Sequence, residues 1–324
     1  MPMPISRRAV LTTGAAAAAL AASSAHAAYP DRAIKVIVPF AAGGGVDVGG
    51  RLIANALAEE LKIAVVVDNR GGAGGVTGMD AAAKAAPDGY TLLTSHSGFT
   101  AMPGLYPKLP FDPVADFDAV VTATSSAYVL AVNSTRPFKS VAEVVAHAKA
   151  HPRTLTYGSA GIGSTVHLAG ELMKSMAGID ILHVPYKGAG PALGDVIGGH
   201  IDMMFGPVVN IMPLDRSGEV RALAVTAARR SIYATELATM IEAGFDGFVV
   251  DSWYGLAAPA GTPREAVMRL NGALNVALRA PAMVAQLEKQ GLEPVGGTPE
   301  EAAALIRGEV EKWTRIIRDA GIKP

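Results

Sequence analysis

The chain has 324 residues with 28 basic and 29 acidic side chains, a nearly neutral balance that does not indicate a nucleic-acid surface. It contains no cysteine, which excludes a disulfide scaffold and thiol chemistry. A chain of this length can bury a substantial core and is typical of two domains.

The first residues predict export. Ser6-Arg7-Arg8 precedes an alanine-rich apolar run, and Ala25-His26-Ala27 provides a small-x-small cleavage site. The run is shorter than the roughly 20 residues that span a bilayer. We therefore predict a signal peptide over residues 1–27, cleaved after Ala27, and a mature chain in the periplasm. The paired arginines suggest the twin-arginine route, and the general secretory route stays open.

A glycine-rich turn follows the first predicted strand. The strand covers residues 34–38, the turn contains Gly43-Gly44-Gly45, and a helix covers residues 47–61. Free N–H groups and the positive end of a helix make such a turn an anion cradle. The turn lacks the Gly-Lys-Ser/Thr ending of a triphosphate loop, and Val48 stands where a dinucleotide fingerprint needs its third glycine. A tight connection without any ligand is the alternative at this point.

Asp47 has two interpretations. It falls in the first turn of its helix, where the dipole favours a negative side chain, and Arg51 follows at i+4 to pair with it. We keep it as a candidate contact to the ligand or to a ligand-bound water.

Strands and helices alternate through the rest of the chain, which predicts an α/β fold with mainly parallel sheets. Small polar turns recur at strand ends, with Ser95 and Ser97 after one strand and Ser159 to Thr165 after another. His96 is either a surface loop residue or a ligand contact. The expected strands cover residues 63–67, 91–95, 118–124, 128–132, 154–157, 181–184, 202–205, 221–226 and 254–258, and the expected helices cover 77–86, 140–150, 164–177, 189–198, 263–279, 281–290 and 299–319.

Three helix starts carry a capping signal. Ser140 is followed by Glu143, and the Thr-Pro-x-Glu pattern occurs at residues 262–265 and 298–301. In each we expect the hydroxyl to cap the helix while the glutamate reaches back to the cap residue.

The motifs of an enzyme are missing from the sequence. No serine lies in a G-x-S-x-G frame, and His167 with Glu171 lacks the second histidine of a zinc site. We expect no metal and no cofactor. Hydrogen bonds to a charged group contribute roughly 1.5–3 kcal/mol each, and a micromolar complex needs about 8 kcal/mol. About six donors in the polar turns could therefore hold a carboxylate without an arginine.

A series of motifs along the chain resembles one family, the periplasmic receptors of tripartite tricarboxylate transporters, often called Bug-type binding proteins. The resemblance covers the whole mature chain. The motifs are Tyr29-Pro30-Asp31-Arg32, Pro39-Phe40-x-x-Gly43-Gly44-x-x-Asp47, Asn69-Arg70-x-Gly72-Ala73-Gly74-Gly75, Pro87-Asp88-Gly89-Tyr90, the run 105–112, Tyr157-Gly158-Ser159-Ala160-Gly161 with His167-Leu168, Val184-Pro185-Tyr186-Lys187-Gly188, the run 221–226, Trp253-Tyr254-Gly255 and the run 258–263.

The resemblance implies a two-lobed periplasmic binding protein of the type II-like, Venus flytrap kind. Residues 28–127 with 253–324 would form lobe 1, and residues 128–252 would form lobe 2. The lobes would close on a small organic acid, a mono- or dicarboxylate that includes aromatic acids, and a monomer would deliver it to membrane transporter subunits. The site residues, taken by position together with Asp47, are Phe40, Gly43, Gly44, Gly45, Ser95, Ser97, Ser159, Gly161, Ser164 and Thr165.

Two departures from the family pattern and two other functions remain open. Positions 45 and 46 usually include a serine, threonine or asparagine, whereas this chain has Gly45-Val46, and residues 231–239 lack the usual prolines. With glycine and valine at positions 45 and 46, a side-chain contact to the ligand is expected to be missing.

The alternatives to a transport receptor are a receptor that reports to a sensor kinase and an exported hydrolase on the same architecture.

Overall fold

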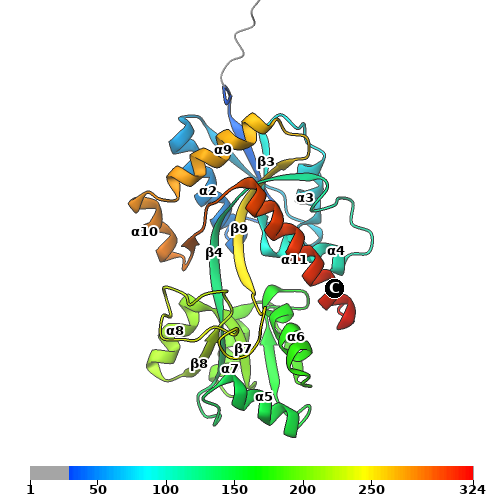
Figure 1. Ribbon diagram of the computed structural model, residues 1–324, viewed down its shortest axis with the longest axis vertical. Helices are drawn as coiled ribbons and strands as arrows, with labels where there is room; N and C mark the ends of the chain where they lie inside the picture. The colour runs from blue at the N-terminus through cyan, green and yellow to red at the C-terminus, as the bar shows by residue number, and fades with distance from the viewer. Residues whose placement is uncertain (1–28, 324) are drawn as a thin grey trace, which may run out of the picture.

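The computed structural model describes residues 29–323, so the predicted signal peptide lies outside the described residues. Two α/β lobes lie one above the other in Figure 1, and two long strands, β4 (Phe117–Asn133) and β9 (Asp251–Pro259), run from one to the other. The expected two-lobed α/β fold is confirmed. Within residues 29–323, no helix combines the length and the apolar character needed to cross a membrane.

The remaining elements divide between the two lobes (Figure 1). The upper lobe contains β1 (Ile34–Val38), α2 (Gly45–Leu61), β2 (Val65–Asn69), the 3₁₀ turn η1 (Ala73–Gly75), α3 (Val76–Ala83), β3 (Thr91–His96), α4 (Ser97–Leu105), α9 (Arg264–Ala277), α10 (Pro281–Lys289), β10 (Glu293–Pro294) and the first part of α11 (Pro299–Asp319). The lower lobe contains α5 (Val141–Ala150), β5 (Thr156–Ser159), α6 (Thr165–Ala177), β6 (Leu182–Pro185), α7 (Ala189–Ile197), β7 (Met203–Pro207), α8 (Val208–Ser217) and β8 (Val220–Val225).

One continuous sheet passes through both lobes in the order β2-β1-β3-β9-β4-β7-β5-β6, and β8 and β10 pair with β4 beside this path. The outer strands of each lobe pair in parallel: β1 with β2 and β3, and β5 with β6 and β7. The pairs made by β4 and β9 are antiparallel. The parallel strands therefore end on the side of each lobe where ligands bind in open α/β sheets.

The central connection differs from the sequence prediction. Residues 118–124 and 128–132 were expected to form two strands, but they belong to the single strand β4. Its first part pairs with β9, up to Ala127 opposite Asp251, and its second part pairs with β7 and β8. Ser125 to Ala127 do not break the strand because a partner strand continues the ladder through them.

Two helices were not predicted. α4 and α8 each contain a proline, Pro103 and Pro213, which normally argues against a helix interior. Both helices are short and largely apolar on the buried side, with Phe99 and Ile211 fully buried. Tertiary packing therefore outweighs the local signal in these segments.

Both faces of the sheet in the upper lobe are covered. On β1, Val36 packs into the apolar cluster below α2 and α9, whereas its neighbour Ile37 packs into the opposite cluster with Phe99 of α4. Neighbouring strand residues point to opposite faces, so a strand buried on both sides is apolar throughout. The lower lobe has two such clusters on β4, β7 and β5.

The lobe boundaries stay a prediction. The expected divisions at residues 127/128 and 252/253 fall inside β4 and β9, which are continuous through both lobes. The end of α11 also packs across the division, because Trp313 and Ile316 share an apolar cluster with Val166 of α6.

The three capping signals have different outcomes. At Thr298 the predicted capping box forms, with the hydroxyl accepting from the Glu301 N–H and the glutamate accepting from the Thr298 N–H. Ser140 caps α5, but Glu143 accepts from the N–H of Lys139 and not from that of Ser140. The cap predicted at Thr262 is wrong.

The reason lies in the turn before α9. Thr262 donates its hydroxyl hydrogen to the Pro259 carbonyl at 2.7 Å, so this side chain closes the turn and does not cap the helix. Its own N–H and that of Gly261 are bound by the carboxylate of Asp118. The Asp118 carboxylate therefore accepts the hydrogen bond from the Thr262 N–H that was expected to go to Glu265.

This difference predicts the outcome of two matched substitutions. Glu301→Ala should lower the free energy of unfolding by about 1 kcal/mol, because the Thr298 N–H loses its partner. Glu265→Ala, at the equivalent position of the second signal, should change it by less than about 0.5 kcal/mol. Urea unfolding of both variants measures the two values, and equal losses would contradict the assigned caps.

Candidate functional site

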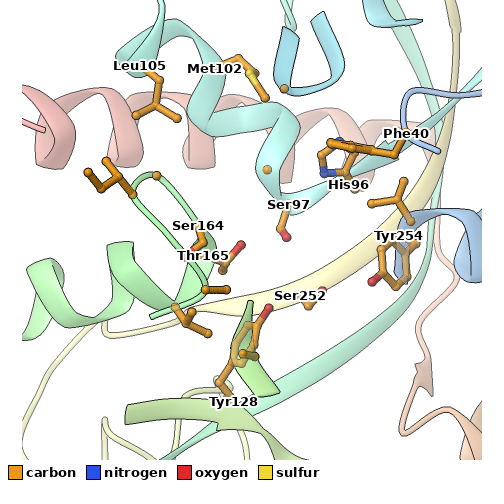
Figure 2. A pocket seen from close by; sticks show the side chains of 18 of the residues that line it. Phe40, His96, Ser97, Met102, Leu105, Tyr128, Ser164, Thr165, Ser252 and Tyr254 are labelled. Atoms are coloured by element: carbon orange, nitrogen blue, oxygen red, sulfur yellow. The ribbon is translucent and has the colours of Figure 1, made fainter. Parts of the chain in front are cut away.

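A cavity of about 440 Å³ lies between the two lobes, beside β4 and β9. Figure 2 shows side chains from both lobes around it. Its lining residues are Phe40, Val46, Gly74, His96, Ser97, Gly98, Met102, Leu105, Tyr106, Tyr128, Ala160, Ile162, Gly163, Ser164, Thr165, Val166, Ala189, Pro207, Ser252 and Tyr254. None of these residues carries a formal charge apart from a protonatable histidine.

The strands between the lobes supply three hydroxyl groups to the cavity. Ser252 and Tyr254 on β9 line it, whereas Asp251 and Trp253 line a separate cavity on the other side of the strands. Tyr128 of β4 lies near Ser252 in Figure 2. The two-residue period of a strand thus places alternate side chains on opposite sides of the sheet.

The tyrosines stay protonated at neutral pH. Burial raises the pKa of Tyr128 to about 12, although the hydroxyls of Ser252 and Thr165 act against this shift. Burial also raises the pKa of Tyr254. Both phenols are therefore neutral groups that can donate a hydrogen bond to a ligand.

Five α-helices begin at the cavity wall. Val46 lies in the first turn of α2, Ser97 begins α4, Thr165 begins α6, Ala189 begins α7, and Pro207 precedes α8. The first N–H groups of a helix have no intrahelical partner, and the helix dipole adds about half a positive charge there. The cavity therefore has a positive potential without a lysine or arginine in its wall.

His96 is a buried polar residue in the cavity wall, directly before α4. It ends β3, is 5% exposed, and has an Nε2 atom without a hydrogen-bond partner. Burial lowers its pKa to about 4, so the imidazole is neutral at pH 7. Of its two sequence interpretations, the surface loop is wrong: His96 faces the cavity and contacts Phe40 edge to face.

Comparisons with known proteins agree with this architecture. Residues 50–322 match the model of the family described as "Tripartite tricarboxylate transporter family receptor". The chain belongs to this family. The protein BugT of Bordetella pertussis is 37% identical over 310 residues, which cover 95% of each chain. The family members and structural relatives are solute-binding receptors, so the chain is a receptor and not an enzyme.

Two solved structures bear on the site. The Rhodopseudomonas palustris protein Rpa4515, solved with adipate, is 36% identical with a TM-score of 0.74, covering 91% of this chain and 100% of that one. A TctC solute-binding protein from Polaromonas, solved without ligand, is 27% identical with a TM-score of 0.83, covering 90% of this chain and 99% of that one.

Four of the predicted site residues line the cavity: Phe40, Ser97, Ser164 and Thr165. Ser97 was expected in a loop but is the first residue of α4, a helix that the sequence did not reveal. Ser97 and Thr165 come from opposite lobes, and both line the cavity that Figure 2 shows.

Ser95 does not lie in the wall of the cavity. It is the last residue of the predicted strand 91–95, but β3 continues to His96, so Ser95 lies inside the strand and is buried and does not begin a polar turn. Its hydroxyl faces Gly255 of β9, where a Cβ atom would lie 2.9 Å from the Ser95 oxygen. Strand alternation therefore turns Ser95 away and His96 toward the cavity.

The glycine turn supports the site without lining it. Gly43 and Gly44 are exposed, and helix α2 begins at Gly45. A Cβ atom at position 45 would lie 2.7 Å from the hydroxyl oxygen of Tyr254, closer than real contacts allow. The glycine that departs from the family pattern thus makes room for a cavity-lining tyrosine.

Asp47 is held within its own lobe. Its carboxylate accepts from Arg51 at 2.9 Å, from the Gly43 N–H at 2.9 Å and from Asn69 at 2.8 Å. The hydrogen bond from Arg51 is the main reason that its pKa falls to about 2. The predicted pairing with Arg51 is confirmed, and the same contacts fix the glycine turn.

The loop at residues 159–164 is fixed by two histidines. Gly163 donates its N–H to Nδ1 of His167 at 3.0 Å, and the Ser159 hydroxyl lies 2.6 Å from Nε2 of His183. Ser159 also accepts from the Gly161 N–H at 3.1 Å. The two imidazoles stack with centroids 4.0 Å apart, and burial lowers both pKa values, that of His183 to about 4.

Ser159 and Gly161 are therefore loop-forming residues in this structure, outside the cavity wall. Ser164 caps α6 by accepting from the His167 N–H, and its hydroxyl donates to the Gly161 carbonyl. These contacts aim the start of α6 at the cavity.

Several lining residues were not found from the sequence. Met102 and Leu105 lie on the unpredicted helix α4, and Tyr128 and Ser252 lie in the continuous part of the strands between the lobes. The signal that could have found Ser252 is its two-residue spacing from Tyr254.

The contacts of Asp47 predict a pH dependence. Because the pKa in the folded state, about 2, lies below the ordinary 3.8, ionised Asp47 stabilises the fold above pH ~4 and this effect is lost as the pH falls toward 2. Asp47→Asn should destabilise the protein at neutral pH, and the difference from wild type should shrink on acidification. Urea unfolding across this pH range measures it. Asp68→Asn, in an exposed ion pair with Arg70, should have little effect.

The role of His167 predicts local hydrogen exchange. His167→Ala should speed exchange of the Gly163 amide at least tenfold, because the N–H loses its acceptor. His167→Asn should keep most of the protection, since its amide oxygen takes the place of Nδ1. Amide exchange followed by NMR reads both, and identical Gly163 rates in wild type and His167→Ala would contradict the assigned bond.

Proposed function

We propose that this receptor captures a small organic carboxylate in the cavity between its lobes. The observation that carries the proposal is the convergence of five helix N-termini on a cavity whose wall has no acidic side chain. A negative ligand gains about 0.3–1 kcal/mol at each exposed helix start and up to about 2 kcal/mol in buried geometries. A relative of 36% identity was solved with the dicarboxylate adipate, which supports the same ligand class.

Hydrogen bonds from neutral groups complete the proposed site. Ser97 and Thr165 of the sequence prediction are the proposed hydroxyl contacts from the helix starts, with His96 and Tyr254 added by the structure. Ser164 lines the cavity, but its hydroxyl already donates to the Gly161 carbonyl, so its proposed role is to cap α6. Hydrogen bonds to a carboxylate contribute roughly 1.5–3 kcal/mol each. Four of them total roughly 6–12 kcal/mol, which is comparable with the roughly 8 kcal/mol of a micromolar complex before the cost of ordering the ligand.

The remaining predicted site residues have a supporting role in this proposal. Gly43, Gly44, Gly45 and Asp47 shape the start of α2, Ser95 anchors β3, and Ser159 and Gly161 hold the loop before α6.

Delivery to a membrane transporter follows from the family. We infer that the chain acts in the periplasm as a monomer, with lobes at residues 28–127 plus 253–324 and 128–252. Closing of the lobes around the ligand would create the state that the transporter subunits recognise. A receptor for a sensor kinase would use the same cavity and differ in its partner.

The exported hydrolase is a poorer fit. Its best candidate is the Ser159 and His183 pair, but Ser159 is fully buried and its hydroxyl is engaged by Gly161. A nucleophile needs contact with substrate, and this one lies behind the loop.

A ligand screen tests the proposal. The melting temperature of the mature protein should be measured with mono-, di- and tricarboxylates and with aromatic acids. At least one acid should raise it, by an amount that grows with the ratio of the acid concentration to its Kd. Stabilisation by a neutral sugar with none by any acid would overturn the carboxylate assignment.

A negative charge introduced into the wall sharpens this test. Ser97→Asp should abolish the shift, because two unit charges about 4 Å apart repel by about 4 kcal/mol at an effective dielectric of 20. Asparagine has nearly the same shape as aspartate but no charge, so Ser97→Asn should keep the Kd within about tenfold of the wild-type value. Equal binding by both variants would remove the start of α4 from the anion site.

A further inference from the structure

Helix α4 forms one wall of the cavity along most of its length. Ser97 and Gly98 line it at the start of the helix, and Met102 and Leu105 line it further on. At 1.5 Å per residue, Met102 and Leu105 stand about 7.5 and 12 Å along the helix axis from Ser97. Figure 2 shows both side chains displaced from Ser97 toward the same end. The cavity is therefore elongated along α4.

The chemistry of the wall changes along this axis. Near Ser97 the ligand meets the hydroxyl of Thr165 and the free N–H groups of α4 and α6. Near Leu105 the wall consists of thioether and aliphatic groups. Leu105 is also the last residue of α4, where free carbonyls form the negative end of the helix dipole. The potential that attracts an anion at one end opposes it at the other.

The far end of the cavity is closed by an apolar contact between the lobes. A Cβ atom on Gly163 would lie 3.1 Å from a methyl group of Leu105, so the loop before α6 packs on this side chain. Ile162 of the same loop also lines the cavity. The hydroxyl of Tyr106, which follows Leu105 in the chain, lies against Gly74. A second carboxylate at this end would have no charged partner among the lining residues.

We infer that the preferred ligand is a monocarboxylic acid with an elongated apolar body. Its carboxylate lies at the starts of α4 and α6, and its body extends along α4 to Met102 and Leu105. The inference rests on the proposed carboxylate site and narrows its ligand class. It separates this chain from a dicarboxylate receptor, because Met102 and Leu105 offer apolar groups where a second carboxylate would need donors.

Three probes of one length test the inference. Octanoate has one carboxylate, suberate adds a second at the other end, and octanamide replaces the carboxylate with a neutral amide. Isothermal titration of the mature protein should give a Kd for octanoate at least tenfold lower than for suberate or octanamide.

The three probes separate two kinds of failure. If suberate binds as tightly as octanoate, the inferred preference for an apolar group at the far end is wrong, and the proposed carboxylate site is unaffected. Octanamide binding as tightly as octanoate would overturn the carboxylate site. Binding of none of the three would overturn the ligand class inferred here.

A substitution at the far end should reverse the preference. Met102→Lys places an ammonium group near the second carboxylate and should lower the Kd ratio of suberate to octanoate at least tenfold relative to wild type. Met268→Lys makes the same exchange on the exposed side of α9, away from the cavity, and should leave the ratio unchanged. An unchanged ratio in Met102→Lys, with the folded state verified by circular dichroism, would contradict the proposed orientation of the ligand.

Discussion

The antiparallel pairing of β4 with β9 is the constraint on which the rest of the structure depends. It runs from Phe117 opposite Pro259 to Ala127 opposite Asp251, with two register shifts on the way. Each shift adds a residue on one strand, and such bulges increase local twist and bend the ladder. Both lobes are assembled on these two strands, so the position of the cavity and the side chains of its floor follow from one strand pair.

The proposed anion site contains no positive side chain. In this proposal, helix starts and hydroxyl groups stabilise the anion through fixed dipoles, and the neutral imidazole of His96 adds no charge. Tyr128 and His96 do not change their charge near neutral pH, because burial raises the pKa of Tyr128 to about 12 and lowers that of His96 to about 4. It also avoids a buried ion pair, whose desolvation can exceed its Coulomb energy.

The fold was largely predictable because its signals are local. Alternating strands and helices, glycine turns and the family motifs indicated two α/β lobes and their order. Long-range contacts decided what the sequence could not reveal. Pro103 masked the helix that carries Met102 and Leu105, the Pro259 carbonyl redirected the hydroxyl of Thr262, and a continuous partner strand joined two predicted strands into β4.

The same distinction applies to the site. Phe40, Ser97, Ser164 and Thr165 could be placed from motifs because each lies between the end of a strand and the first residue of the next helix, or is that first residue. Ser95 and His96 show the limit of that method: the sequence located the segment, but only the strand register determined which of the two side chains faces the cavity.

The contact between Gly45 and Tyr254 has a consequence for comparing these receptors. A side chain at position 45 would have to displace the phenol of Tyr254, since its Cβ and the phenol oxygen would be 2.7 Å apart. The two positions, 209 residues apart in the chain, are therefore coupled through the cavity wall. A serine or threonine at position 45 would change the shape of the wall even in a receptor that keeps the tyrosine.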